Sequence, residues 1–107
     1  KRAMKFMRAF SADAENSLTD LHEYIARFGS PDTADRFTEG IILQCESMCT
    51  FPLRGTPRDD IRPGVRITHY RKRVTIAYTV EDGQVTILDV FYAGQDYETI
   101  LRDDTDD

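Results

Sequence analysis

The sequence of 107 residues has no hydrophobic run long enough to cross a bilayer, and no apolar signal segment opens it. A membrane-spanning helix needs about 20 consecutive apolar residues, and a secretory signal needs an apolar stretch near its start. Met4 is a candidate for the natural start, which would make Lys1, Arg2 and Ala3 leftover residues. We therefore expect a soluble, cytoplasmic protein without a membrane partner.

Cysteine is scarce. The only two, Cys45 and Cys49, lie four residues apart in a segment with a helical pattern. Helical spacing seldom gives the Cα separation and Cβ directions that a disulfide requires. The two histidines, His22 and His69, lie far away in the sequence, so the usual ligand spacing of a zinc site is missing. We expect both cysteines to pack in the core, and we expect no cofactor and no metal.

Recognisable catalytic motifs are also missing. The sequence has no glycine-rich phosphate loop, no serine nucleophile elbow and no acidic metal cluster. Asp59 and Asp60 are adjacent, but Arg58 and Arg62 flank them, which favours salt bridges that fix a loop. His69 could be a general base, although a lone histidine on an alternating strand is more often simply exposed.

Positive charge is unevenly distributed along the chain. The net charge is −5, yet residues 54–73 hold seven of the 14 basic residues and two acidic ones, so this band carries +5 and the rest −10. A basic band on an acidic body suits an anionic partner for one face. Charges that guard an exposed strand edge against aggregation explain it equally well. The overall acidity argues against extensive nucleic-acid binding.

The first half of the chain has the pattern of one strand and two helices. Residues 5–10 have strand character, and Ser11 is a helix N-cap before an apolar stripe that ends at Gly29. Ser30-Pro31-Asp32 starts a second helix at once, and Phe51-Pro52 ends it. So short a link predicts an antiparallel helical hairpin.

The second half changes to a strand pattern. Residues 52–64 contain three prolines and two glycines and predict an extended loop. The Asp82-Gly83 pair favours a tight hairpin turn, and a short final helix over 96–102 precedes an acidic tail at 103–107. The expected strands are 65–70, 74–80 and 85–92, the last covered on one side by the helices. Residues 1–107 thus predict a single α+β domain, with an N-terminal strand, a helical hairpin, a three-stranded antiparallel meander and a short C-terminal helix.

Particular residues stand out within this order of elements. They are Asp20-Leu21-x-x-Tyr24-Ile25-Ala26, Ala34-Asp35-Arg36-Phe37, the run from Phe51 to Arg66, Ile76-x-Tyr78, and Val90 to Tyr97. Together they resemble the RelE/ParE toxin superfamily, and its ParE branch in particular, over about residues 6–101. The resemblance implies a toxin of a type II toxin–antitoxin system, neutralised in a hetero-oligomer by a ParD-like or related antitoxin. A groove between the helical hairpin and the sheet, flanked by positive charge, would suit the acidic tail of such an antitoxin.

The resemblance also bears on mechanism. RelE-like members cleave mRNA on the ribosome with basic residues on the central strands and a late Arg, His or Tyr. Here Arg66 keeps one cation, but Thr68, Thr75 and Asp96 occupy positions where further basic groups are expected, although Tyr97 lies close to the late position. Most of that catalytic set is missing. The resemblance therefore favours a ParE-type toxin that binds DNA gyrase and is not itself an enzyme.

Three hypotheses remain open, and none includes sequence-specific binding of nucleic acid. For a gyrase inhibitor, the residues expected to contact the target or the antitoxin are Arg58, Arg62, Arg66, Arg71, Lys72, Arg73, Tyr92 and Tyr97, with the segment 92–101 as a second contact region. For a ribosome-dependent mRNA endoribonuclease, the catalytic candidates are Arg66, His69, Arg71, Arg73 and Tyr97. The third hypothesis is a member that binds its antitoxin but has weak or lost toxicity or another target. Packing at the edge of the sheet explains Tyr78 and Tyr97 as well as a contact role does.

Overall fold

A computed structural model describes residues 6–103. The elements are, in chain order, β1 (Met7–Phe10), α1 (Ala12–Phe28), α2 (Pro31–Thr50), β2 (Thr56–Pro57), β3 (Arg66–Tyr70), β4 (Val74–Glu81), β5 (Gln84–Tyr92) and α3 (Tyr97–Asp103). The strands form one sheet in the order β1-β5-β4-β3-β2. Strand β1 is parallel to β5, whereas the other neighbours are antiparallel. The predicted α+β order is confirmed, with one short strand more, β2, inside the expected loop.

Two of the terminal predictions fall largely outside the described residues. Residues 1–3, which we considered as leftover residues, lie there, and so do residues 104–107 of the expected acidic tail. Asp103, which we placed in that tail, is the last residue of α3.

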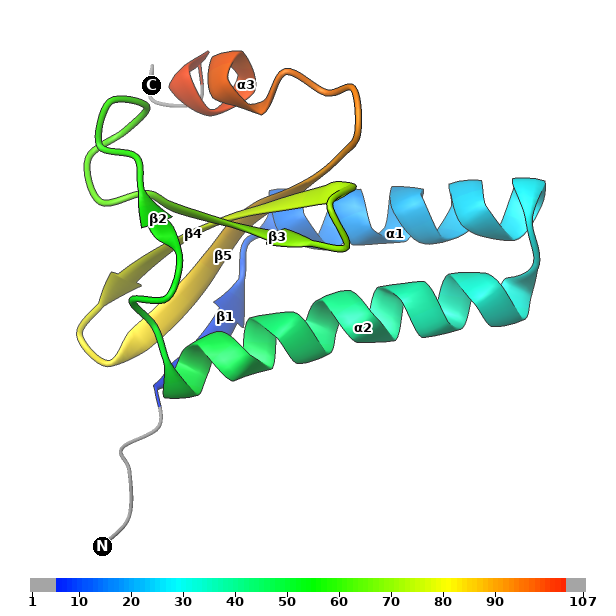
Figure 1. The fold of residues 1–107 in the computed structure, drawn as a ribbon, viewed down its shortest axis with the longest axis horizontal. Helices are drawn as coiled ribbons and strands as arrows, with labels where there is room; N and C mark the ends of the chain where they lie inside the picture. The colour runs from blue at the N-terminus through cyan, green and yellow to red at the C-terminus, as the bar shows by residue number, and fades with distance from the viewer. Residues whose placement is uncertain (1–5, 104–107) are drawn as a thin grey trace, which may run out of the picture.

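Local capping explains why the helical hairpin forms where the sequence predicted it. The Ser11 hydroxyl accepts a hydrogen bond from the Ala14 amide at 3.0 Å, and the Ser30 hydroxyl accepts one from the Thr33 amide at 3.1 Å. These bonds satisfy amides that have no partner inside the helix. Between the helices, the Gly29 amide closes α1 on the Ile25 carbonyl. The caps thus set where each helix begins and ends. The two helices lie antiparallel on the same face of the sheet (Figure 1).

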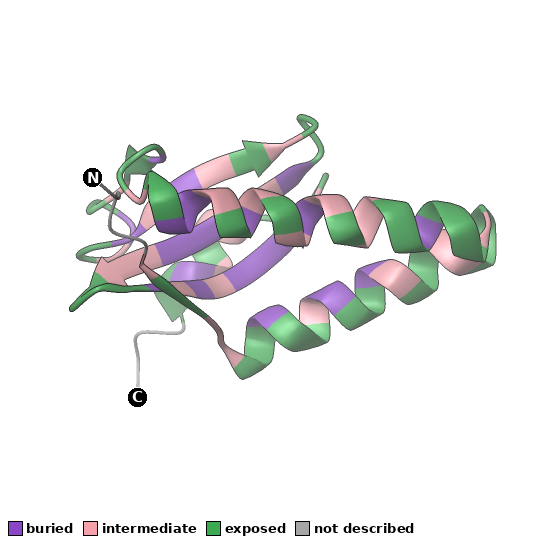
Figure 2. Ribbon diagram, turned by 90° about the horizontal axis from the view of Figure 1, so that it is seen from below, coloured by how far each residue is buried: buried purple, intermediate pink, exposed green. Residues whose placement is uncertain are grey.

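The opposite face of the sheet is covered as well. There Ile61, Val65 and Leu101 pack with Phe91 in a second apolar cluster, to which α3 and the loop before β3 contribute. The sequence predicted that helices would cover one side of residues 85–92, and the structure shows both sides covered. Figure 2 accordingly shows purple, buried strands inside the molecule and green, exposed outer faces on the helices.

The remaining core contains both cysteines. Cys45 and Cys49 are buried and unoxidised, which confirms their packing role. Burial raises the pKa of the Cys45 thiol to about 12, so the thiol stays protonated at neutral pH. No helix within residues 6–103 is long and apolar enough to span a bilayer.

Candidate partner-binding site

Arg66 is turned onto the loop that follows α2. Its Nη1 donates to the Gly55 carbonyl at 2.6 Å and to the Leu53 carbonyl at 3.2 Å. Tyr78 holds the same loop, because its hydroxyl donates to the Pro52 carbonyl and accepts from the Gly55 amide, both at 2.9 Å. Tyr78 is fully buried on an inner strand, so the expected packing at the edge of the sheet is wrong for this residue. Burial also raises the pKa of Tyr78, which keeps its hydroxyl neutral.

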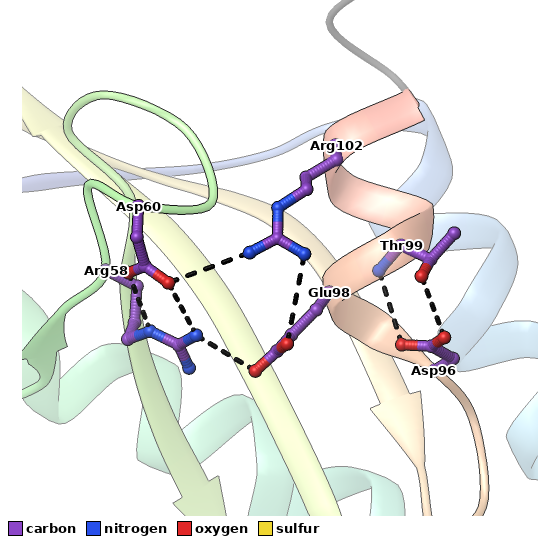
Figure 3. Close-up of polar contacts among 6 residues, drawn as sticks. All are labelled: Arg58, Asp60, Asp96, Glu98, Thr99 and Arg102. Carbon is purple, nitrogen blue, oxygen red and sulfur yellow. Dashed lines mark hydrogen bonds and ion pairs between the residues drawn. The ribbon is translucent and has the colours of Figure 1, made fainter.

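Arg58 belongs to a network of four charges that joins the segment between β2 and β3 to α3 (Figure 3). Its guanidinium makes two hydrogen bonds of 2.9 Å to Asp60 and a third of 2.9 Å to Glu98. The Arg102 guanidinium also pairs with both carboxylates, with Nη2 3.7 Å from Asp60 Oδ2 and Nη1 3.9 Å from Glu98 Oε1. Hydrogen bonds from Arg58 hold the pKa of Asp60 below its usual range, and the two carboxylates raise the pKa of Arg58. The expected loop-fixing salt bridge is therefore confirmed for Arg58 and Asp60.

The other predicted residues of this region lie close by but have different surroundings. Asp59 accepts a hydrogen bond from the Gly64 amide at 2.8 Å, and it forms no ion pair with any residue from 6 to 103. Arg62 is half-buried, and its side chain forms no ion pair within residues 6–103. Tyr97 packs its ring 5.9 Å from that of Phe91, against the second apolar cluster.

Arg71, Lys72 and Arg73, here called the cationic turn, form the exposed link between β3 and β4. None of the three forms an ion pair with another residue of the described chain. Arg71 and Lys72 have φ angles of 53° and 63°, a conformation that Asn-Gly pairs usually supply in such turns. The predicted turn at Asp82-Gly83 has the same positive φ angles, 51° and 76°, with residues suited to it. Three cations thus stand together on a strained turn.

A row of aromatic rings runs from the cationic turn to the far end of α1. The ring centroid of Tyr70 lies 5.4 Å from that of Phe37, and the Phe37 centroid lies 6.5 Å from that of Tyr92. Tyr92 lies 6.3 Å from Tyr24, and Tyr24 lies 5.0 Å from Phe28. Tyr92, predicted as a contact residue, is thus a half-buried member of this row. Arg73 reaches its hydroxyl at 3.5 Å.

A cleft lies between α2 and the cationic turn. Its narrower part is a cavity of about 290 Å³, lined by Thr33, Arg36, Phe37, Tyr70 and Arg71. A wider groove of about 510 Å³ continues from it along α2, past Gly40 and Leu43 to Arg54. The groove lies between α2, Tyr70 at the end of β3 and the cationic turn, and it is lined by Arg36, Arg54 and Arg71 together with one acidic residue, Glu39. Arg36 was not among the predicted contact residues, because an exposed arginine on a helix carries no signal that a distant turn will lie beside it.

The catalytic candidates of the ribonuclease hypothesis are not brought together. Arg66 and His69 are three residues apart on one strand, so their side chains leave on opposite faces of the sheet. His69 is exposed, as expected, with its Nδ1 3.3 Å from the Thr75 hydroxyl. Tyr97 lies in α3, and Arg73 lies in the turn at the other end of β3 from Arg66. Within residues 6–103, no group of three His, Cys, Asp or Glu side chains could hold a metal ion.

Comparisons with known proteins agree with this geometry. The sequence profile of the ParE toxin of type II toxin–antitoxin systems (parDE) matches residues 9–97. A solved structure of the chromosomal ParDE toxin–antitoxin system from P. aeruginosa superposes with a TM-score of 0.73 at 17% identity, covering 86% of this chain and 99% of that one. The RelBE2 toxin–antitoxin complex from Mycobacterium tuberculosis gives 0.67 at 18% identity, covering 88% and 98%. No curated protein sequence matches.

Proposed function

Because the chain belongs to the ParE toxin family of type II toxin–antitoxin systems, we propose that it inhibits DNA gyrase by binding and performs no chemistry itself. The toxin class follows from the family match over residues 9–97. Gyrase as the target, and the cytoplasm as the place of action, are part of the proposal.

The arrangement of the cations carries this proposal. RNA cleavage needs groups that activate the 2′-hydroxyl, stabilise the phosphate charge and protonate the leaving oxygen around one reacting atom. Here Arg66 donates hydrogen bonds to backbone carbonyls of the loop between α2 and β2, and the His69 side chain lies on the other face of the sheet. The cationic turn, in contrast, is exposed and forms no ion pair within the described chain. Cations on an exposed turn support binding to an anionic surface more than catalysis.

We further propose that a ParD-like or related antitoxin neutralises the protein. The two solved structures compared above, which share this fold, are of toxin–antitoxin systems. The cleft beside α2 adds support, because it combines the exposed apolar side chain of Leu43 with arginines from three segments of the chain.

The test of the function compares the two targets directly. Antitoxin-free protein is incubated with purified gyrase and supercoiled DNA, and in parallel with ribosomes that carry mRNA. We expect accumulated cleaved DNA and intact mRNA. Cut mRNA with unaffected gyrase would establish the ribonuclease alternative instead, and inactivity in both assays would indicate another or a lost target.

The contact residues are tested in the same gyrase assay. The triple variant Arg71→Gln, Lys72→Gln, Arg73→Gln should raise the protein concentration needed for DNA cleavage. Arg27→Gln, at an exposed arginine in the last turn of α1, is a control for the loss of one surface cation away from the turn, and it should leave that concentration unchanged. Equal activity of the triple variant and the control would remove the cationic turn from the contact surface.

A further inference from the structure

Two arginines from distant segments line the same cavity. Arg36 comes from α2 and Arg71 from the cationic turn, and Thr33 adds a hydroxyl beside them. Neither arginine forms an ion pair within the described chain. A guanidinium presents its N–H groups as a planar fork that matches a carboxylate. The cavity therefore has the donors for an anionic group.

The aromatic floor of this cavity fixes where Arg71 stands. A Cβ atom added to Gly40 would lie 1.9 Å from the Tyr70 hydroxyl oxygen, so only glycine lets this ring lie across α2. The Tyr70 ring also packs edge-on against Phe37, and the Arg71 Cζ lies 5.5 Å from the Tyr70 ring centroid. This contact is a cation–π arrangement. The Arg71 guanidinium is thus placed against a ring that itself packs on Phe37 of α2.

The backbone of the cationic turn is strained, although a tight turn between two strands can be made without this strain. Both Arg71 and Lys72 have positive φ, which is costly for residues with a Cβ. The turn at Asp82-Gly83 has similar positive φ angles, but it uses an Asp-Gly pair, which adopts them at low cost. Strained backbone of this kind concentrates at functional sites.

From these observations we propose that the cavity between α2 and the cationic turn is a carboxylate-binding pocket for an acidic side chain of the antitoxin. The identity of the partner rests on the proposed function, whereas the chemistry of the ligand does not. The adjoining groove exposes Leu43, at 63%, and is lined by Arg54 as well as by Glu39, so it suits an apolar segment that carries a few acidic residues near the arginines.

The surroundings favour a peptide over a nucleic acid. Glu39 lines the adjoining groove, Asp32 and Asp35 are exposed on the same helix, and the chain as a whole is acidic. A long polyanion such as duplex DNA would be repelled by these charges along its length, whereas a single carboxylate in the cavity has only Arg36 and Arg71 as charged lining residues.

The pocket is tested on the full protein alone, with small probes followed by two-dimensional amide NMR. The probes are acetyl-glutamic acid amide, its neutral glutamine analogue and inorganic phosphate. We expect the acidic probe to bind weakly but saturably, and to shift the amides of Thr33, Tyr70 and Arg71. The glutamine analogue should shift them far less. Arg71→Gln should weaken binding on the order of tenfold, since a hydrogen bond to a charged group is lost.

Lys72→Gln is the matched control, because it removes the same charge from the same strained turn but does not line the cavity. It should keep most of the affinity for the acidic probe. Equal shifts by the glutamine analogue, or an equal loss in Lys72→Gln and Arg71→Gln, would overturn the pocket. Tighter binding of phosphate than of the acidic probe would overturn the acidic peptide as the ligand. Because neither gyrase nor antitoxin is present, these failures are separate from a failure of the gyrase assay.

Discussion

Arg66 and Tyr78 stand opposite each other across β3 and β4, and together they hold the loop between α2 and β2. Arg66 binds two carbonyls of this loop, and Tyr78 binds a carbonyl and an amide. Outside the helices and strands of the described chain, no backbone–backbone hydrogen bond reaches these loop groups, so the two side chains supply their protein partners. We infer that Arg66 contributes to the stability of the fold in addition to any contact with a partner.

Removing the Tyr78 hydroxyl should destabilise the protein. Tyr78→Phe deletes two hydrogen bonds and leaves the buried Gly55 amide without its acceptor. The expected loss is about 1–3 kcal/mol in the free energy of unfolding, measured by urea denaturation. Tyr97→Phe is the control with little expected change, because the described chain provides no hydrogen-bond partner for the Tyr97 hydroxyl. Equal stability of Tyr78→Phe and wild type would contradict this role.

Replacing the residues of the cationic turn by the pair usual in such turns should stabilise the fold. The double variant Arg71→Asn, Lys72→Gly relieves positive φ at two residues with unsuitable side chains. We expect a gain of about 1 kcal/mol, seen as a higher Tm, together with weaker binding of the acidic probe. Asp82→Asn, in a turn that already has a suitable pair, should give no comparable gain. A double variant less stable than wild type would show that the turn is not strained.

The network around Asp60 should make stability depend on acid pH. The folded-state pKa of Asp60 lies below its ordinary value, first because of the hydrogen bonds from Arg58. Its ionised form therefore stabilises the fold above the ordinary pKa near 4, and that contribution is lost as the pH falls through the folded pKa. Asp60→Asn should be less stable than wild type at pH 7, and the two should converge towards pH 3 in urea denaturation. A difference that stays constant with pH would rule out this linkage.

The buried thiols should react only when the protein opens. The pKa of Cys45 is raised to about 12 by burial, so thiolate is almost absent at pH 8, and Cys49 is 3% exposed. Alkylation by iodoacetamide should be slow in native protein and fast in urea, as mass spectrometry would show. Rapid labelling of native protein at pH 8 would mean that α2 opens readily.

Much of the fold could be predicted because its signals are local. The caps at Ser11 and Ser30 and the turn at Asp82-Gly83 lie next to the structures that they determine. The cover on the opposite face of the sheet could not be predicted, because the apolar cluster there brings together Leu101 and Ile61 from segments 40 residues apart.

The candidate site was less predictable for the same reason. Composition located the basic band, but the uses of its members depend on distant partners. Arg58 pairs with Glu98, Arg66 binds the loop after α2, and Arg71 shares a cavity with Arg36. Only the third of these arrangements leaves a cation available to a partner.

The central claim is that the protein inhibits gyrase by binding to it in a fixed stoichiometry and does not act as an enzyme. The most direct measurement titrates antitoxin-free protein against a fixed concentration of purified gyrase and follows both loss of supercoiling and accumulation of cleaved DNA. We predict saturation near one equivalent of protein per binding site on gyrase, with mRNA on ribosomes left intact at the same concentrations. Unaffected gyrase, together with mRNA cut by amounts of protein far below those of the ribosomes, would contradict the claim.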